Sequence, residues 1–156
     1  MGAHRIADGV MAGTIAGIAS GLPSTLTAIV TGSDPLEATY AAGSMLLPEE
    51  TDRTRLIAAA AVVHGSLSVV WGVVLAQVLP RKATVLSGAL AGLAIAAVDL
   101  GFVGPRFPRV AALRPVPQIA DHVAFGVIAG AVVAARRARR APGSRRSVPD
   151  ALRPNR

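Results

Sequence analysis

The amino-acid sequence predicts an all-α integral membrane bundle of four transmembrane helices, with a short amphipathic helix in the first outer loop. Only 16% of the 156 residues are charged and 52% are hydrophobic, whereas a soluble domain carries about a quarter charged residues. Eight of the fifteen arginines lie between residues 136 and 156, and there is no cysteine. This composition argues against a soluble globular enzyme, a disordered chain and a disulfide-stabilised secreted domain.

Four hydrophobic runs are long enough to cross a bilayer, which requires about 20 mostly apolar residues. Residues 9–33 carry no charge, and neither do residues 56–80. The third run is interrupted by Asp99, and the fourth by Asp121 and His122. We therefore predict one transmembrane domain over residues 1–136, with helices at about 9–30, 56–79, 83–103 and 118–136.

The distribution of basic residues predicts the orientation, because lysine and arginine are enriched in cytoplasmic loops. Eleven of the sixteen basic residues fall on the side of the two termini, among them Arg5, Arg81 and Lys82. Both termini are therefore expected in the cytoplasm, with residues 137–156 as a disordered arginine-rich tail. The single lysine among the basic residues is typical of a GC-rich bacterial genome, so the membrane is predicted to be a bacterial plasma membrane.

The two outer loops are predicted to differ. The segment Asp34-Pro35-Leu36-Glu37 has the pattern of a helix start, with Asp34 as the N-cap. A short amphipathic helix should follow to about Leu46 and lie on the membrane surface. Residues 104–118 contain four prolines and three arginines, which predicts an extended loop with little regular structure.

Glycine recurs at helical spacing and predicts where the helices pack. Small residues let transmembrane helices approach each other closely, and a spacing of four keeps them on one face. The first helix has the clearest stripe, and the other three have weaker ones completed by alanine. A short repeat also relates Trp71-Gly72 to Phe125-Gly126. The predicted packing residues are Gly9, Gly13, Gly17, Gly21, Gly72, Gly88, Gly92, Gly126 and Gly130.

The small-residue stripes end in polar residues, and the direction of each helix places these toward the outer side. At 1.5 Å rise per residue, the polar groups should form one layer about 5–10 Å from the helix midpoints. Pro23 falls in this layer and should bend the first helix there. Asp121 lies nearer the outer boundary, where it would cap its own helix. The candidate intramembrane polar site comprises Ser24, His64, Ser68, Asp99, Asp121 and His122.

Three functions fit this layer. The first is a structural or accessory subunit, in which the polar residues only bond helices together and the Gly9–Gly21 stripe joins a second copy or a membrane-protein partner. The second is a proton- or cation-linked transporter or channel, because ionisable residues inside a membrane are costly and commonly functional. In that case His64 and His122 are the natural partners of Asp99. The third is a metal or haem site.

The remaining motifs argue against other classes. We find no nucleophile or phosphate-binding motif, so an enzyme is not expected, and neither is a cofactor. The cluster Arg136, Arg137, Arg139 and Arg140 should bind anionic lipid head groups. Nucleic-acid binding is not expected, because the tail has no aromatic residue to stack on bases.

Overall fold

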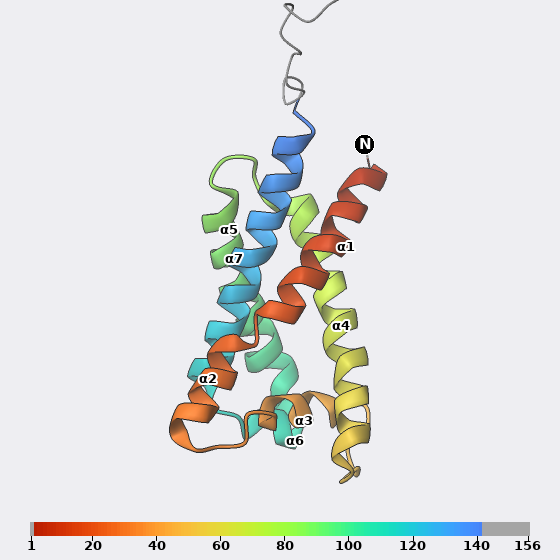
Figure 1. Ribbon diagram of the computed structural model, residues 1–156, viewed down its shortest axis with the longest axis vertical. Helices are drawn as coiled ribbons and strands as arrows, with labels where there is room; N and C mark the ends of the chain where they lie inside the picture. The colour runs from red at the N-terminus through yellow and green to blue at the C-terminus, as the bar shows by residue number, and fades with distance from the viewer. Residues whose placement is uncertain (1, 142–156) are drawn as a thin grey trace, which may run out of the picture.

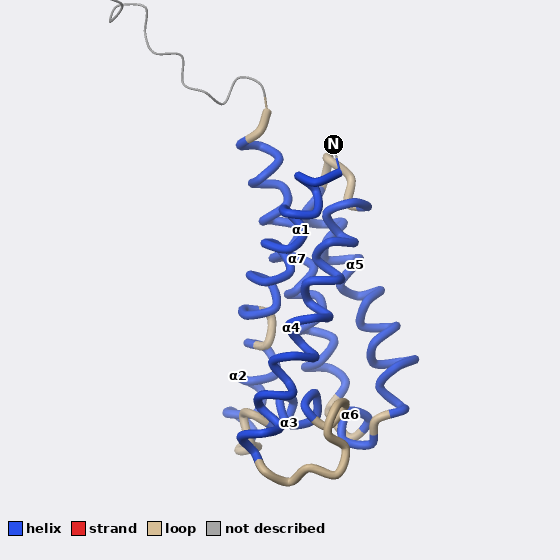
Figure 2. Tube along the Cα trace, turned by 90° about the vertical axis from the view of Figure 1, so that its right-hand side faces the viewer, coloured by secondary structure: helices blue, strands red, loops and turns tan. Residues whose placement is uncertain are grey.

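The computed structural model describes residues 2–141, and it confirms the all-α class. Four segments of this described chain are long and apolar enough to cross a membrane: Gly2–Thr31, Arg53–Val78, Thr84–Arg106 and Pro115–Arg139. The N-terminus and the end of the last helix lie at one end of the bundle, and the short helices of the connections lie at the other (Figure 1). Figure 2 shows the same helices from the side, joined by short loops at both ends.

The first span is two helices, α1 (Gly2–Ala19) and α2 (Leu22–Thr31). A turn at Ser20 and Gly21 separates them, and Pro23 lies in the first turn of α2. Proline has no amide hydrogen to donate there, so a first-turn position suits it. The bend predicted at Pro23 is therefore a complete break in the helix. Helix α1 also begins earlier than predicted, so Arg5 and Asp8 belong to it.

The second span is the unbroken helix α4 (Arg53–Val78). The carboxylate of Asp52 accepts a hydrogen bond from the Arg55 amide at 2.9 Å and so caps the start of α4. The backbone amides of Asp52 and Thr51, together with the Arg55 side chain, hold the pKa of the Glu50 carboxyl below its usual value. Arg109 donates to the Glu50 carbonyl at 3.2 Å, and this bond joins the connection before α4 to the connection before α7.

The third span changes its winding at Asp99. The α-helix α5 (Thr84–Val98) continues as the π-helical segment η1 (Asp99–Val103) and the 3-10 turn η2 (Gly104–Arg106). A π-helical turn inside a helix is rare and is often found at functional sites. The wider turn begins at Asp99 itself, toward the end of the span away from the N-terminus of the chain. The fourth span, α7 (Pro115–Arg139), is a continuous α-helix.

The connection before α4 contains less helix than predicted, and the connection before α7 contains more. Helix α3 (Glu37–Gly43) is shorter than predicted, and Asp34 accepts from the Leu36 amide at 2.9 Å without capping the helix. Residues 104–118 are not extended, because η2 and the short helix α6 (Pro108–Ala111) occupy this connection. That prediction was wrong because Pro105 and Pro108 fill first-turn positions of these helices, where proline is tolerated.

The four spans pack as two antiparallel pairs, α1 with α4 and α5 with α7, and α1 also packs against α7. Glycines bring each pair together. A Cβ atom on Gly17 would lie 2.6 Å from the Ser68 hydroxyl, and one on Gly72 would lie 2.5 Å from the Cα atom of Gly13. In the second pair, Gly88 lies against the backbone of Gly126, and Gly92 against that of His122.

Of the predicted packing glycines, Gly21 makes no such contact. Gly9 lies against Val73 and Gly130 against Thr84, both at close range. Gly21 has nothing within 4 Å of its Cβ direction, because it lies in the break between α1 and α2. The glycines of the first stripe therefore pack inside this chain as far as Gly17.

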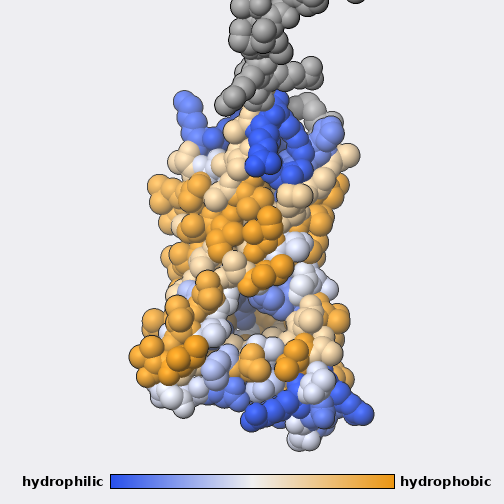
Figure 3. Space-filling view, in the orientation of Figure 1, coloured by the Kyte–Doolittle hydropathy of each residue, from blue (hydrophilic) through white to orange (hydrophobic). Residues whose placement is uncertain are grey.

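Large apolar side chains face outward around the bundle, as expected of a surface in contact with lipid. Ile18 is 83% exposed and Val30 is 85% exposed, whereas the interior consists mainly of small residues such as Ala12, Ala16 and Ala129. Figure 3 shows the resulting apolar band, bounded by polar groups at both ends. This distribution is the reverse of that in a soluble protein, and it supports a membrane location.

Candidate functional site

A cavity of about 530 Å³ lies among α2, α4, η1 and α7, in the half of the bundle away from the N-terminus. Figure 3 shows it as a hollow with polar residues inside and apolar side chains on both sides. All six residues of the predicted polar site line it: Ser24, His64, Ser68, Asp99, Asp121 and His122. The structure therefore brings together residues that come from four different segments of the chain.

Asp99 and His122 form the closest ionisable pair in the cavity. The His122 Nε2 atom lies 3.4 Å from the Asp99 Oδ2 atom, and the His122 Nδ1 atom lies 2.7 Å from the Gln118 carbonyl oxygen. A carbonyl oxygen only accepts hydrogen bonds, so Nδ1 carries a proton. A second proton can then lie between Nε2 and the carboxylate. The pair is neutral with this proton and carries one negative charge without it.

His64 does not pair with Asp99. Its Nε2 atom lies 2.9 Å from the carbonyl oxygen of Gly17, near the end of α1. The last carbonyls of a helix have no backbone donor, and the break after Ala19 creates such an acceptor in the middle of the first span. His64 thus satisfies one end of the broken helix.

Asp121 satisfies the other end. Its Oδ1 atom accepts a hydrogen bond of 2.9 Å from the Ser24 amide, which lies in the first turn of α2. Asp121 does not cap its own helix as predicted, because α7 begins six residues earlier, at Pro115. The two broken ends of the first span are therefore each bonded by an ionisable side chain from another span.

Replacing Asp121 tests this capping role. Asp121→Ala removes the acceptor of the Ser24 amide, and losing a helix cap costs about 1 kcal/mol. We expect faster hydrogen–deuterium exchange at the first turn of α2 and little change in α5. Asp121→Asn keeps a side-chain oxygen in place and should leave the exchange near that of the wild type. Equal exchange in the alanine variant would contradict the capping role.

Two further polar or aromatic lining residues, Gln118 and Trp71, were not among the predicted site residues. Gln118 holds His122 through its carbonyl oxygen and also lines the cavity, as does Trp71. The position of Gln118 four residues before His122 could have indicated this bond, because the backbone carbonyl at that spacing in a helix lies within reach of the later side chain. Ser68, by contrast, is buried against Gly17 and contributes mainly to packing.

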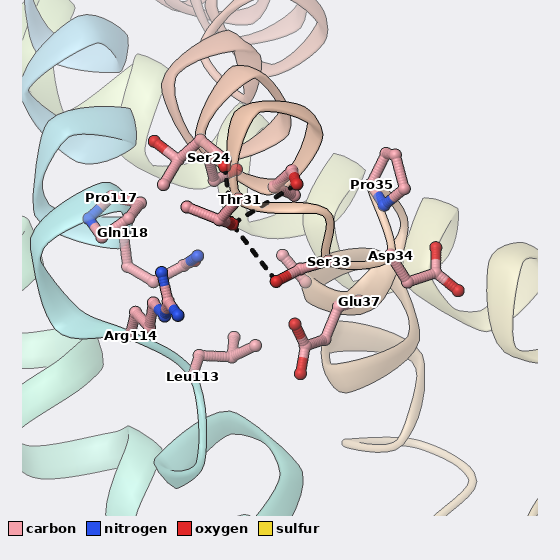
Figure 4. Close-up of a pocket in the computed structure, with 13 residues that line it drawn as sticks. Ser24, Thr31, Ser33, Asp34, Pro35, Glu37, Leu113, Arg114, Pro117 and Gln118 are labelled. Atoms are coloured by element: carbon pink, nitrogen blue, oxygen red, sulfur yellow. Dashed lines mark hydrogen bonds between the residues drawn. The ribbon is translucent and has the colours of Figure 1, made fainter.

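A second, smaller cavity of about 50 Å³ lies beside the first, toward the end of the bundle that holds α3 and α6. Figure 4 shows Thr31, Ser33 and Glu37 on one side of it and Arg114 and Gln118 on the other. The Thr31 and Ser33 hydroxyls lie 3.2 Å apart. The volume of this smaller cavity suits a few water molecules at most. It shares Gln118 and Ser24 with the large cavity, so polar groups continue from the large cavity toward that end of the bundle.

The geometry does not favour a metal or haem site. Within residues 2–141, no group of three or more His, Cys, Asp or Glu side chains lies close enough together to hold a metal ion. The Nε2 atom of His64 lies on the Gly17 carbonyl, and both ring nitrogens of His122 have partners in the protein. Axial haem ligation would require these contacts to break.

The arginines at the end of α7 bind within the chain. Arg136 and Arg140 both bond the buried carboxylate of Asp8, the latter at 2.5 Å. Arg137 donates to the carbonyls of Ala76 and Leu79 at the end of α4, at 3.0 and 3.1 Å. These contacts join α7 to α1 and α4. The predicted binding of lipid head groups by this cluster, which includes Arg139, stays a prediction.

The predicted tail at residues 137–156 is helical to Arg139, and its part beyond residue 141 lies outside the described residues.

No protein-family model matches this chain, and no curated protein or solved structure shows a significant similarity to it. The fold and the cavity therefore define the class of protein by themselves. It is a small α-helical protein with four segments able to span a membrane, a broken first span and a cavity lined by histidine and aspartate.

Proposed function

We propose that this chain is a proton- or cation-linked transporter or channel whose ionisable groups act in the large cavity. The observation that carries the proposal is the meeting of His64, Asp99, Asp121 and His122 in one cavity. Among the described residues, no lysine or arginine lines it. Ionisable groups inside a membrane are costly and commonly mark ion or substrate pathways.

The Asp99–His122 pair supplies the chemistry for this function. With one shared proton the pair is neutral, and after releasing it the pair carries one negative charge that favours a cation. Proton release and cation binding can therefore alternate at the same place without a buried net charge. A break in the first span beside this pair resembles the discontinuous helices that form ion sites in transporters.

A purely structural or accessory role has less support. It relied on the Gly9–Gly21 stripe to join a second copy or a partner, and Gly9, Gly13 and Gly17 pack against α4 within the chain. It also leaves a cavity of 530 Å³ without a role.

We further propose that the protein lies in a bacterial plasma membrane with both termini in the cytoplasm. The end of the bundle that holds the N-terminus also holds Arg81, Lys82 and the arginines of α7. Positive residues favour the cytoplasmic side. The cavity would then lie toward the outer side of the membrane, at the level of the break between α1 and α2.

Proton flux into liposomes tests the proposed function. Vesicles loaded with the pH dye pyranine, with valinomycin and a potassium gradient setting the potential, should acidify faster with the wild type than without protein. Asp99→Asn cannot exchange a proton, so the flux should fall at least about tenfold, to the level of empty vesicles. The exposed loop variant Glu49→Gln removes the same charge outside the cavity and should keep the wild-type flux.

The structural role predicts a different result. If Asp99 only bonds helices together, Asp99→Asn should lower the melting temperature in detergent and leave any flux per folded molecule unchanged. That outcome, or a wild type no faster than empty vesicles, would overturn the proposed function.

A further inference from the structure

The mouth of the large cavity faces sideways between α2 and α4. Helix α2 packs against α7, whereas α4 packs against α1 and α3, and the hollow in Figure 3 opens between them. Ile18, Ile57 and Leu67 line the cavity and are also 40% exposed or more. They therefore form an apolar rim, at the depth where the outer surface of the bundle is apolar. A molecule can reach the cavity through this rim from the hydrocarbon layer.

Both acidic and aromatic side chains line the interior of the cavity. Asp99 and Asp121 line it, without a lysine or arginine among the described lining residues. Trp71 and Phe125 also line it, although the whole sequence has only one tryptophan, one tyrosine and three phenylalanines. Aromatic faces attract cations, so both kinds of side chain favour the same charge.

The size of the cavity selects among cations. A volume of about 530 Å³ lies within the range of pockets that bind organic ligands, about 300–1,000 Å³. A bare inorganic ion would contact the carboxylates and leave the apolar walls without a partner. An organic cation with an apolar body would contact both.

From these observations we infer that the cavity binds an amphipathic organic cation that enters from the bilayer between α2 and α4. The positive group lies against Asp99 and Asp121, and the apolar body lies against Trp71, Phe125 and the rim. This inference rests on the proposed function and names the class of its ligand. A lipid acyl chain, which has no positive charge, is the competing occupant.

Trp71 offers a direct measurement, because it is the only tryptophan in the sequence. The full chain in phosphatidylcholine nanodiscs is titrated with tetraphenylphosphonium while Trp71 fluorescence is recorded. We expect a saturable change, and a much smaller one with the neutral analogue triphenylphosphine oxide. Asp99→Asn and Asp121→Asn should each weaken binding about tenfold or more, since each removes a charge partner in a poorly hydrated site.

Matched variants separate binding from folding. Glu49→Gln removes one exposed acidic charge outside the cavity and should bind as the wild type does. Asp99→Glu keeps the charge and should retain most of the affinity. Gel filtration tests folding separately, because an unfolded variant would not elute as a single species. Only variants that pass gel filtration are compared.

Three results would overturn the inference: no saturable binding, wild-type affinity in both aspartate variants, or equal affinity of the wild type for the cation and its neutral analogue. The last would identify an apolar cleft for lipid. The proton-flux experiment needs no tetraphenylphosphonium, so its outcome is independent. Flux that depends on Asp99 without cation binding would retain the proposed function and reject this ligand class.

Discussion

Replacing both Arg136 and Arg140 with alanine should lower the free energy of unfolding by about 3–5 kcal/mol. Asp8 is only 4% exposed, and these two guanidinium groups bond its carboxylate. Without them a buried charge has no compensating partner, and removing one side of a buried ion pair has costs of this size. The measurement is unfolding in mixed micelles by titration with a denaturing detergent, followed by circular dichroism.

A third substitution makes this expectation specific. Adding Asp8→Asn to the double variant removes the buried charge and should recover much of the lost stability. In the wild-type background, Asp8→Asn should cost less than the double arginine change, because Arg136 and Arg140 are 26% and 40% exposed and can turn toward water.

The matched control removes the same charge from the same end of the bundle. Arg81 and Lys82 lie exposed in the turn before α5, so Arg81→Ala with Lys82→Ala should change the unfolding free energy by less than about 1 kcal/mol. If this control costs as much as the Arg136 and Arg140 pair, general charge loss explains the effect. If the triple variant recovers nothing, the contact with Asp8 is not its source.

This cluster also shows what sequence reasoning could and could not predict. The excess of arginine at the end of α7 predicts a cytoplasmic location for this end from composition alone. The use of Arg136 and Arg140 to bond Asp8 depends on α1 crossing α7, which joins residues 128 and 132 positions apart. No local sequence pattern predicts such a pairing, and Asp8 was predicted to lie just outside the first span.

The candidate site was also predictable in one respect and not in another. The polar layer was predictable because helix direction and a rise of 1.5 Å per residue fix the depth of each residue. The partners within the layer were not, since they depend on helix rotation and on the break after Ala19. That break created a free carbonyl for His64 and a free amide for Asp121, which left His122 as the partner of Asp99.

The short repeat in the sequence has a counterpart in the packing. Gly72 lies between Gly9 and Gly13 of α1, and Gly126 lies between Gly88 and Gly92 of α5. One turn before these glycines, the backbone of Ser68 lies against Gly13, and in the second pair the backbone of His122 lies against Gly92. The two antiparallel pairs therefore share one register, and both Ser68 and His122 line the cavity.

Gly72→Ala should destabilise the bundle by about 1–3 kcal/mol, the usual cost of overpacking, and Gly72→Val by more. A Cβ atom at this position would lie 2.5 Å from the Gly13 Cα and N atoms. These are backbone atoms, so no side chain can turn away and α1 must move from α4. Gly126→Ala should act similarly between α5 and α7, because its Cβ would lie 2.9 Å from the Gly92 amide nitrogen.

Gly65→Ala is the matched control for both variants. Gly65 also lies within α4, but nothing lies within 4 Å of its Cβ direction. Alanine should there stabilise the helix by about 0.5–1 kcal/mol, because it loses less backbone entropy on folding than glycine does. Thermal unfolding by circular dichroism, with gel filtration of each variant, separates the possible outcomes. If Gly72→Ala leaves the melting temperature unchanged but alters the size of the eluting particle, these glycines pack between copies of the chain, and the α1–α4 contact described above is wrong.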